Sequence, residues 1–300
     1  MDNVPDGAHL RLRSRVHAAY LSADEDGVGV SLRSHGGGAS MNEVWRLQRF
    51  EEQGRHFVVL QGAAYGRYLA NSFRKPPTGH RGRRAVQRDF AEDFSPLMWS
   101  ALAVGGGFIR LRHEYDYNLR SNGKHPPEFD CNLRANGRHR FWNTSVTVDL
   151  CGRKESTMMH WKVEVIPQTQ VPPPLPLPTE YEGGFSVLFR WLTRHKEDRR
   201  TIRHVRADDE GRFNRNHDGW DSFPFYGRSI YNLRAELGIL EPDGNIPGIT
   251  ICVRPGWVGR LTPLVTDLPR SEDPLDIVVL TTDSPGTEAL RYPDFDAPAP

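Results

Sequence analysis

Two short acidic clusters contain the residue types that general acid and base catalysis uses. They are Asp24-Glu25-Asp26 and Asp208-Asp209-Glu210, and each is followed directly by a glycine, which is typical of a turn. Catalytic carboxylates need a water-poor cleft that shifts their pKa values, whereas the tip of a turn is wet. We therefore interpret both clusters as solvated turns and not as catalytic pairs.

The histidines and cysteines are the residues that would bind a metal ion or act as nucleophiles. The 12 histidines and 3 cysteines are scattered, without a CxxC or HExxH spacing. Cys252 lies in an apolar run and is expected to be an inert, buried thiol. The sequence also lacks GxSxG and GxxxxGK[ST] motifs. We therefore predict no catalytic residue, no cofactor and no metal site, and a protein that is not an enzyme.

Arginine-rich loops are the best remaining candidates for binding a partner. The two sets are Arg81, Arg83 and Arg84 in one loop, and Arg134, Arg138 and Arg140 in another. Guanidinium groups that converge form a patch suited to an acidic protein surface or to phosphates. The alternative interpretation is that both sets are solvated loop residues.

Composition restricts the class of partner and the compartment. With 39 Lys and Arg against 38 Asp and Glu, the formal charge is +1, so no global field points to nucleic acid or to a membrane surface. No run approaches the roughly 20 apolar residues of a membrane-spanning helix, and no signal peptide opens the chain. An odd number of cysteines is atypical of a disulfide framework. We expect a soluble protein of the cytoplasm, with the nucleus as the alternative.

The first half of the chain repeats itself three times, at intervals of about 50 residues. In each copy, short alternating runs such as Leu10-Arg-Leu-Arg13 place apolar groups on one face of a strand. Three units of roughly four strands each predict a β-trefoil, which is a pseudo-threefold barrel with hairpins. The residues expected in its core are Leu12, Leu60 and Leu111 with Trp45, Trp99 and Trp161.

A proline-rich stretch separates this half from a second domain. The five prolines within residues 171–178 favour a stiff, extended linker, although Pro173 to Pro176 also forms a PxxP motif that an aromatic-lined groove could bind. A hairpin, one helix and further strands then predict an α+β ubiquitin-like β-grasp domain. The expected boundaries are 1–167 for the trefoil, 168–199 for the linker and a short amphipathic segment, 200–283 for the β-grasp domain and 284–300 for a flexible tail.

Several strings resemble a known family. Tyr65-Gly-Arg-Tyr-Leu-Ala70 and Phe141-Trp-Asn-Thr-Ser-Val-Thr147 resemble a plant family of uncharacterised proteins with a fascin-like, actin-cross-linking-type β-trefoil. Tyr226-Gly-Arg-Ser229 and Gly259-Arg-Leu-Thr-Pro-Leu-Val265 resemble the ubiquitin-like domain that accompanies this trefoil. The resemblance implies a mainly β protein with these two domains, and it introduces F-actin as a candidate partner.

The sequence therefore predicts a non-enzymatic protein-interaction or scaffolding protein, with F-actin as a candidate partner of the trefoil loops. A carbohydrate-binding, lectin-like trefoil is the alternative. It is disfavoured because the Gln-x-Trp signature common in such lectins is missing from all three repeats, where Glu43, Leu97 and Met159 stand in place of the glutamine. The sequence indicates no membrane partner, no clear nucleic-acid partner and no particular oligomeric state.

Overall fold

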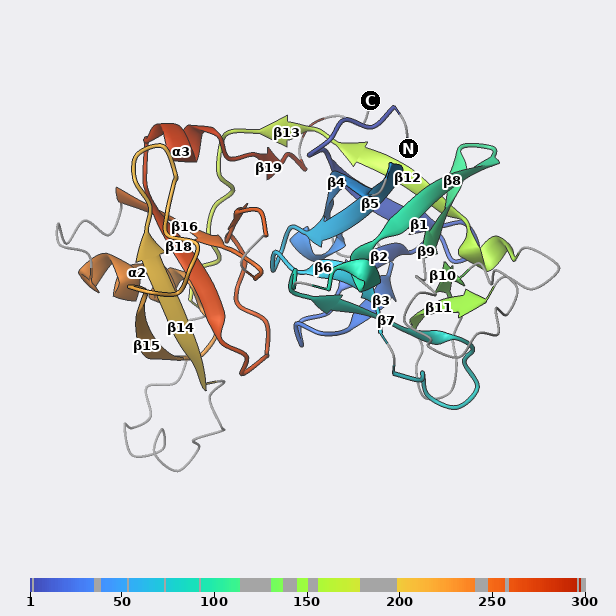
Figure 1. Ribbon diagram of the computed structural model, residues 1–300, viewed down its shortest axis with the longest axis horizontal. Helices are drawn as coiled ribbons and strands as arrows, with labels where there is room; N and C mark the ends of the chain where they lie inside the picture. Colours follow the sequence, from blue (N-terminus) through green and yellow to red (C-terminus); the bar gives the residue numbers. More distant parts are fainter. Residues whose placement is uncertain are drawn as a thin grey trace. The chain divides into compact units, whose positions relative to one another are not determined.

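The computed structural model divides the chain into two compact units, whose elements are labelled in Figure 1. The first unit comprises residues 1–169 and 293–300, and the second comprises residues 170–292. The structure describes residues 1, 3–34, 39–52, 54–72, 74–91, 93–113, 131–136, 145–150, 156–178, 199–240, 248–256, 259–295 and 297.

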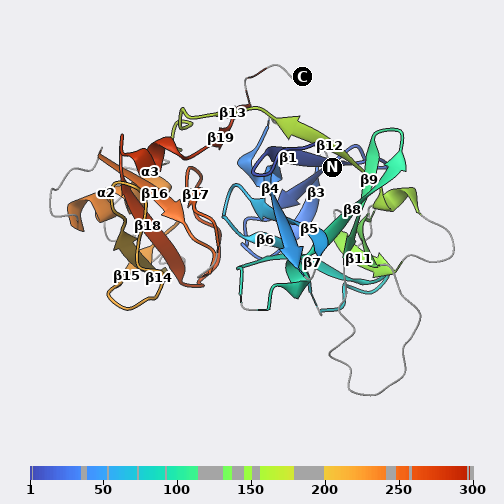
Figure 2. The same cartoon turned by 45° about the horizontal axis from the view of Figure 1, so that its top comes forward.

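The first unit contains a twelve-stranded sheet in three groups of four strands. The groups are β1 (His9–Ser14), β2 (Tyr20–Ala23), β3 (Val30–Arg33) and β4 (Trp45–Glu52); β5 (Arg55–Gly62), β6 (Tyr68–Asn71), β7 (Arg83–Arg88) and β8 (Trp99–Gly105); and β9 (Phe108–His113), β10 (Cys131–Ala135), β11 (Val146–Leu150) and β12 (Trp161–Ile166). The first and last strands of the groups pair into a closed ring in the order β1, β4, β5, β8, β9, β12 and back to β1 (Figure 2). The middle strands form the hairpins β2–β3, β6–β7 and β10–β11. This is the predicted β-trefoil, which is confirmed.

The three tryptophans occupy equivalent places in the ring. Each opens the last strand of its group, is fully buried and stands in register between residues of the two neighbouring strands. Trp45 stands between Leu10 and Gly62, Trp99 between Val58 and His113, and Trp161 between Ile109 and Ser14. The first strand of each group contacts two of these tryptophans, at positions four residues apart. A fully buried leucine lies halfway between the two positions: Leu12 in β1, Leu60 in β5 and Leu111 in β9. The six residues expected in the core therefore share one interior.

A short 3-10 turn comes immediately before each of these strands. The turns are η1 (Met41–Glu43), η2 (Ser95–Leu97) and η4 (Thr157–Met159). The hydroxyl groups of Ser40 and Ser156 accept hydrogen bonds from the first turn of η1 and η4, and Pro96 lies in the first turn of η2. Because each turn fixes the direction of the chain just before a tryptophan, the three rings enter the barrel in the same way.

The second unit is a five-stranded mixed sheet crossed by one helix. Its elements are β14 (Arg199–Arg206), β15 (Asp221–Tyr226), α2 (Ile230–Leu240), β16 (Ile249–Val253), β17 (Thr262–Pro263), β18 (Leu275–Thr281) and α3 (Pro285–Glu288). The strand order is β15-β14-β18-β16-β17, with β14 parallel to β18 and the other pairs antiparallel. This arrangement is the predicted β-grasp and completes the predicted fold class.

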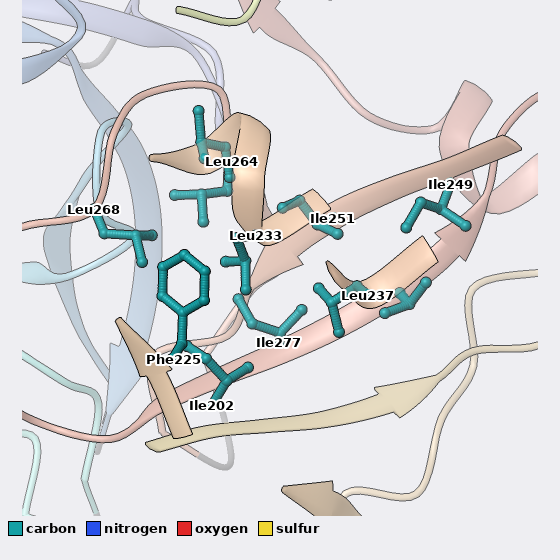
Figure 3. Packing of buried hydrophobic residues seen from close by; sticks show 11 residues of the cluster. Ile202, Phe225, Leu233, Leu237, Ile249, Ile251, Leu264, Leu268 and Ile277 are labelled. Carbon is teal, nitrogen blue, oxygen red and sulfur yellow. The ribbon is translucent and has the colours of Figure 1, made fainter. Parts of the chain in front are cut away.

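The core of this unit lies between α2 and the sheet (Figure 3). Leu233 and Leu237 project from one face of α2, because residues four apart lie on the same side of a helix. They meet Ile202, Ile251 and Ile277 from three adjacent strands, and all five side chains are buried. The hydroxyl group of Ser229 accepts a hydrogen bond from the backbone N–H of Asn232, which fits its expected place just before the helix.

Residues 284–292, in the first part of the expected tail, contain a short helix and a buried tyrosine. Ser284 caps α3 by accepting a hydrogen bond from the backbone N–H of Thr287. Within the same unit, the N–H of Gly286 donates to the carbonyl oxygen of Asp209 at 2.8 Å. The side chain of Tyr292 is buried further along. A serine followed by a proline is typical of the start of a helix. Because Tyr292 is buried after this helix, residues 284–292 are part of the folded unit.

Candidate functional site

The structure brings four of the predicted arginines onto or next to three adjacent strands. Arg83 and Arg84 open β7, and Arg134 lies in β10, with β11 between these two strands. Thr147 of β11 pairs with Arg84 on one side and with Arg134 on the other. Arg81 is exposed two residues before β7. The other two predicted residues lie outside the described part of the chain: Arg138 and Arg140.

The loop that carries Arg81 is fixed against β11. His80 Nδ1 lies 3.0 Å from the hydroxyl oxygen of Ser145. Gly82 has a φ of +81°, and a Cβ at this position would lie 2.2 Å from the carbonyl oxygen of Val148. Glycine satisfies both the left-handed conformation and the close approach of the two backbones. The close packing of the backbone at Gly82 against β11 therefore determines where the arginines on either side of Gly82 lie.

Arg134 is engaged within the protein. Its Nη1 lies 3.1 Å from Asp149 Oδ2, its Nε donates to Asn136 Oδ1 at 3.0 Å, and its Nη2 lies 3.0 Å from the sulfur of Met158. A guanidinium group would lose these contacts on turning toward a partner, and Asp149 would be left buried without its cation. Arg134 therefore links β10 and β11, and it stays a predicted partner-binding residue together with Arg81, Arg83 and Arg84.

The two acidic clusters differ in environment. Asp208 lies in an exposed turn, where hydrogen bonds from Arg212 hold the pKa of its carboxyl below the usual value. Asp24 is partly buried and accepts a hydrogen bond from the hydroxyl group of Ser31 at 2.5 Å. Burial raises the pKa of Asp24, and the charge of Asp26 adds to this effect. The solvated-turn interpretation describes Asp208 and not Asp24.

A buried carboxylate in the second unit contacts both a histidine and an arginine. Asp276 in β18 is 8% exposed and lies 2.6 Å from Arg203 Nε and 2.8 Å from His217 Nε2. An aspartate–histidine pair occurs in hydrolase triads, where it activates a nucleophile. Cys252 is a poor candidate for that role, because burial raises the pKa of its thiol to about 12. In the described part of the chain, no three His, Cys, Asp or Glu side chains are grouped as a metal site would require.

The outer side of the barrel carries a row of basic and aromatic residues that the sequence analysis missed. Cross-strand partners follow one another in register through β3, β2, β1, β12 and β9. We call this set the basic row; its members are Arg33, Tyr20, Arg13, Lys162 and Phe108. Directly opposed residues of antiparallel strands share a face. With neighbouring strands about 4.8 Å apart, the row spans roughly 19 Å.

Further side chains order the two aromatic rings of the basic row. The guanidinium carbon of Arg11 lies 5.0 Å from the centre of the Tyr20 ring, and the Tyr20 hydroxyl donates to Glu164 Oε2 at 3.0 Å. Burial and the bond to Glu164 raise the pKa of Tyr20. At the other end, the guanidinium carbon of Arg15 lies 4.8 Å from the centre of the Phe108 ring. Both rings are therefore covered by arginine.

Arg13 and Lys162 stand directly opposite each other in the β1–β12 pair. Like charges at opposed positions destabilise a sheet. Arg15 and Arg33 add positive charge nearby, whereas Arg11 stands opposite Glu164 and lies 3.9 Å from its Oε2 atom. The excess charge is local, because the whole chain carries a formal charge of only +1. An anionic group above the row would reduce the repulsion between Arg13 and Lys162.

Comparison with known families agrees with the fold. Residues 1–131 match the family described as a beta-trefoil domain of unknown function (DUF569), and residues 198–280 match the DUF569 associated ubiquitin-like domain. The chain carries a DUF569 β-trefoil and its associated ubiquitin-like domain. Both matches are to domain families of unknown function and not to enzyme families. None of the curated proteins matches the sequence.

Solved structures similar to the DUF569 trefoil are distant in sequence. A designed threefold-symmetric protein, ThreeFoil, is 16% identical, with 52% of this chain and 96% of that chain covered and a TM-score of 0.38. The BEL β-trefoil is 14% identical over 55% and 97% of the two chains, with a TM-score of 0.39. The SDF2-like protein from Arabidopsis thaliana is 15% identical over 53% and 93%, with a TM-score of 0.37. These values provide no argument about function.

Part of the basic row can be predicted from the alternation of apolar and charged residues in the DUF569 trefoil. In Leu10-Arg-Leu-Arg13 and Trp161-Lys-Val-Glu-Val165, the apolar positions predict which charged side chains point outward. The neighbour relation between β1 and β12 joins residues about 150 positions apart and follows from closure of the barrel, which single-strand patterns do not encode. Separately, no helix in the described ranges combines the length and the apolarity needed to cross a bilayer.

Proposed function

We propose that the chain is a non-enzymatic interaction protein whose trefoil binds an acidic protein surface through the basic row. The observation that supports this most strongly is the opposed pair Arg13 and Lys162, which costs stability in the free protein. The negative charge of an acidic partner would attract both cations and reduce the repulsion between them. Arg81, Arg83 and Arg84 form the second candidate surface, on another part of the same barrel.

A protein partner fits the basic row better than single-stranded nucleic acid does. Nucleic acid without sequence preference binds by stacking its bases on exposed aromatic rings beside a basic groove. Tyr20 is buried beneath Arg11, and Arg15 lies over Phe108. The rings therefore order the arginines, and the groups presented to a partner are cations with fixed positions.

The three tryptophans that open the last strands do not support the carbohydrate alternative. Trp45, Trp99 and Trp161 are fully buried, and each indole N–H is bonded to a backbone carbonyl group. Sugar recognition by stacking requires an exposed ring face, so these three rings are not available for it. A glycan array would test carbohydrate binding at other positions of the trefoil.

F-actin is the first acidic partner to test, because of the resemblance to fascin-like trefoils. The full-length chain is expected to co-sediment with F-actin at low salt and to dissociate as salt screens the charges. Failure to co-sediment at both low and near-physiological salt would exclude F-actin as a partner of the chain. Binding to a fluorescent polyglutamate peptide then tests the broader proposal, and tighter binding to single-stranded DNA would contradict it.

Lys162→Glu separates the proposed function from an effect on folding. The substitution places a carboxylate opposite Arg13, so we expect the chain to gain up to about 1 kcal/mol of stability. Binding to F-actin or polyglutamate should weaken by about fivefold or more at low salt. Lys75→Glu, at an exposed loop position of the same unit, is the matched control and should leave binding nearly unchanged. Equal losses in both variants would show that the basic row is not the binding surface.

A further inference from the structure

The proline-rich segment is packed against the ubiquitin-like unit. Residues 170–178 belong to the same compact unit as the β-grasp sheet. Leu175 packs against the core cluster of that sheet, as do the partly buried Phe223 and Leu275. At the start of the segment, Gln170 Nε2 donates to the carbonyl oxygen of Glu288 at 3.1 Å. We call residues 171–178 the proline strap.

Exposure along the second part of the strap, residues 173–178, follows a period of three. Pro174 and Leu177 are exposed, and the fraction for Leu177 is 80%. Val171 and Pro172, which come before this part, are both exposed. The partly buried positions are Pro173, Leu175, Pro176 and Pro178. A polyproline II helix has three residues per turn, so one of its edges faces water here while the other two turn inward. Peptides in this conformation lie in the same way on grooves that recognise proline-rich segments.

Two other partly buried residues at the margin of the core lie level with each other in the sheet. Phe223 of the edge strand β15 is paired with Ile202 of β14, which is paired in turn with Leu275 of β18. Partners in register share one face of a sheet, and Ile202 belongs to the core beneath α2. Phe223 and Leu275 therefore extend that core to its margin, and Leu175 of the strap also packs against it.

The domain closes its core without the strap. The fully or nearly fully buried residues of the cluster all lie between Ile202 and Val279, and the match to the ubiquitin-like domain family begins at residue 198. The strap adds one partly buried leucine from more than 20 residues earlier in the sequence. Its five prolines have no N–H group and cannot pair as a strand, so apolar contact must hold most of it.

We propose that the margin of this core, where Leu175 packs, is a binding site for proline-rich segments in the polyproline II conformation, occupied in the isolated chain by its own strap. A proline-rich segment of a partner protein binds by displacing the strap. Because a polyproline II segment is ordered before it binds, it loses little conformational entropy at such a site. The site is separate from the basic row and does not depend on the function proposed for the trefoil.

The test uses the full-length chain and a fluorescent peptide with the sequence of residues 170–178. In the wild type the tethered strap competes at a high effective concentration, so the peptide should bind weakly. Leu175→Asp should release the strap and raise the apparent affinity about tenfold or more, as measured by fluorescence anisotropy. Leu177→Asp is the matched control, because this leucine is 80% exposed, and it should behave as the wild type does. A second peptide, in which aspartate replaces the leucine that corresponds to Leu175, serves as a control. It should bind to neither the wild type nor the Leu175→Asp or Leu177→Asp chain.

Two results would overturn the proposal. The first is a folded Leu175→Asp chain that binds the peptide no better than the wild type does. The second is loss of the unfolding transition of the ubiquitin-like unit in Leu175→Asp, since the strap would then be part of the core. Leu175→Ala provides a milder second variant, for which the proposal requires a folded unit and a peptide affinity between those of the wild type and Leu175→Asp.

Discussion

The indole Nε1 of Trp45 donates to the carbonyl oxygen of Leu21 at 3.0 Å, which joins the last strand of the first repeat to its hairpin. The same bond recurs from Trp99 to Leu69 at 3.1 Å and from Trp161 to Leu133 at 3.0 Å. All three tryptophans are fully buried. The trefoil therefore buries the same hydrogen bond between an indole and a carbonyl group once in each repeat, and the carbonyl group always belongs to the second strand.

Replacement of these tryptophans should have nearly equal effects. Trp45→Phe, Trp99→Phe and Trp161→Phe each leave a buried carbonyl oxygen without its donor and create a small cavity. We expect each to cost about 2 kcal/mol or more in the free energy of unfolding. Trp220→Phe is the control, because the indole of Trp220 donates to Asn214 at an exposed site, and its cost should stay below about 1 kcal/mol. Denaturant unfolding measures all four, and strongly unequal costs in the three repeats would contradict the shared geometry.

Gly82→Ala should disturb the arginine-bearing loop of the trefoil. The new Cβ would be in a left-handed conformation and would overlap the carbonyl group of Val148, so we expect a loss of about 2–4 kcal/mol. Gly107→Ala isolates the conformational part, because Gly107 has a φ of +76° and open space around it. That control should cost about 1 kcal/mol. Similar thermal stabilities of the two variants would show that the loop moves away from β11 without penalty.

Asp24→Asn should stabilise the trefoil at neutral pH. Burial raises the pKa of Asp24, so the folded chain binds this proton more tightly than the unfolded chain does. The ionised carboxylate therefore lowers stability above the raised pKa, and the penalty fades as pH falls toward the ordinary value of 3.8. The amide removes the charge and keeps an oxygen that can accept the hydrogen bond from Ser31. Unfolding measured between pH 7 and pH 3.5 should show an advantage of the variant that shrinks on acidification, and an advantage that grows would refute the prediction.

Asp276→Asn should destabilise the ubiquitin-like unit. The change removes the charge that Arg203 and His217 share, from a carboxyl group that is 8% exposed. Solvent screens both partners, which are about 40% exposed in their side chains. We therefore expect a loss of about 1–3 kcal/mol. Asp218→Asn, at an exposed position of the same loop as His217, should change stability by less than about 0.5 kcal/mol.

Sequence patterns predicted the parts of the fold that repeat or alternate. The trefoil followed from leucines and tryptophans at recurring positions, because each repeat uses the same strand register to bury them. The β-grasp followed from alternating strands and from the spacing of Leu233 and Leu237 in one helix. In both cases, local patterns are sufficient because the burial of one face depends on neighbours in the sequence.

Contacts between distant strands were beyond these patterns. The basic row joins Arg33, Arg13 and Lys162 through the register of three pairings, and no residue type announces which strands become neighbours. Arg134 stays a predicted partner-binding residue, but its ion pair with Asp149 of the adjacent strand could not be foreseen from the sequence. Within the predicted linker, the sequence likewise does not show that Leu175, an apolar residue between prolines, contacts the core of the β-grasp unit.

The ring of the trefoil also begins and ends at the same place. Residue His9 of β1 is paired with Ile166 of β12, so the two ends of the repeated sequence lie side by side. We therefore expect the barrel to form with any of the three repeats placed first along the chain. A circular permutant that joins residue 166 to residue 9 through a short linker and opens at Gly106, in the turn between the second and third repeats, should assemble the same interior from a reordered gene.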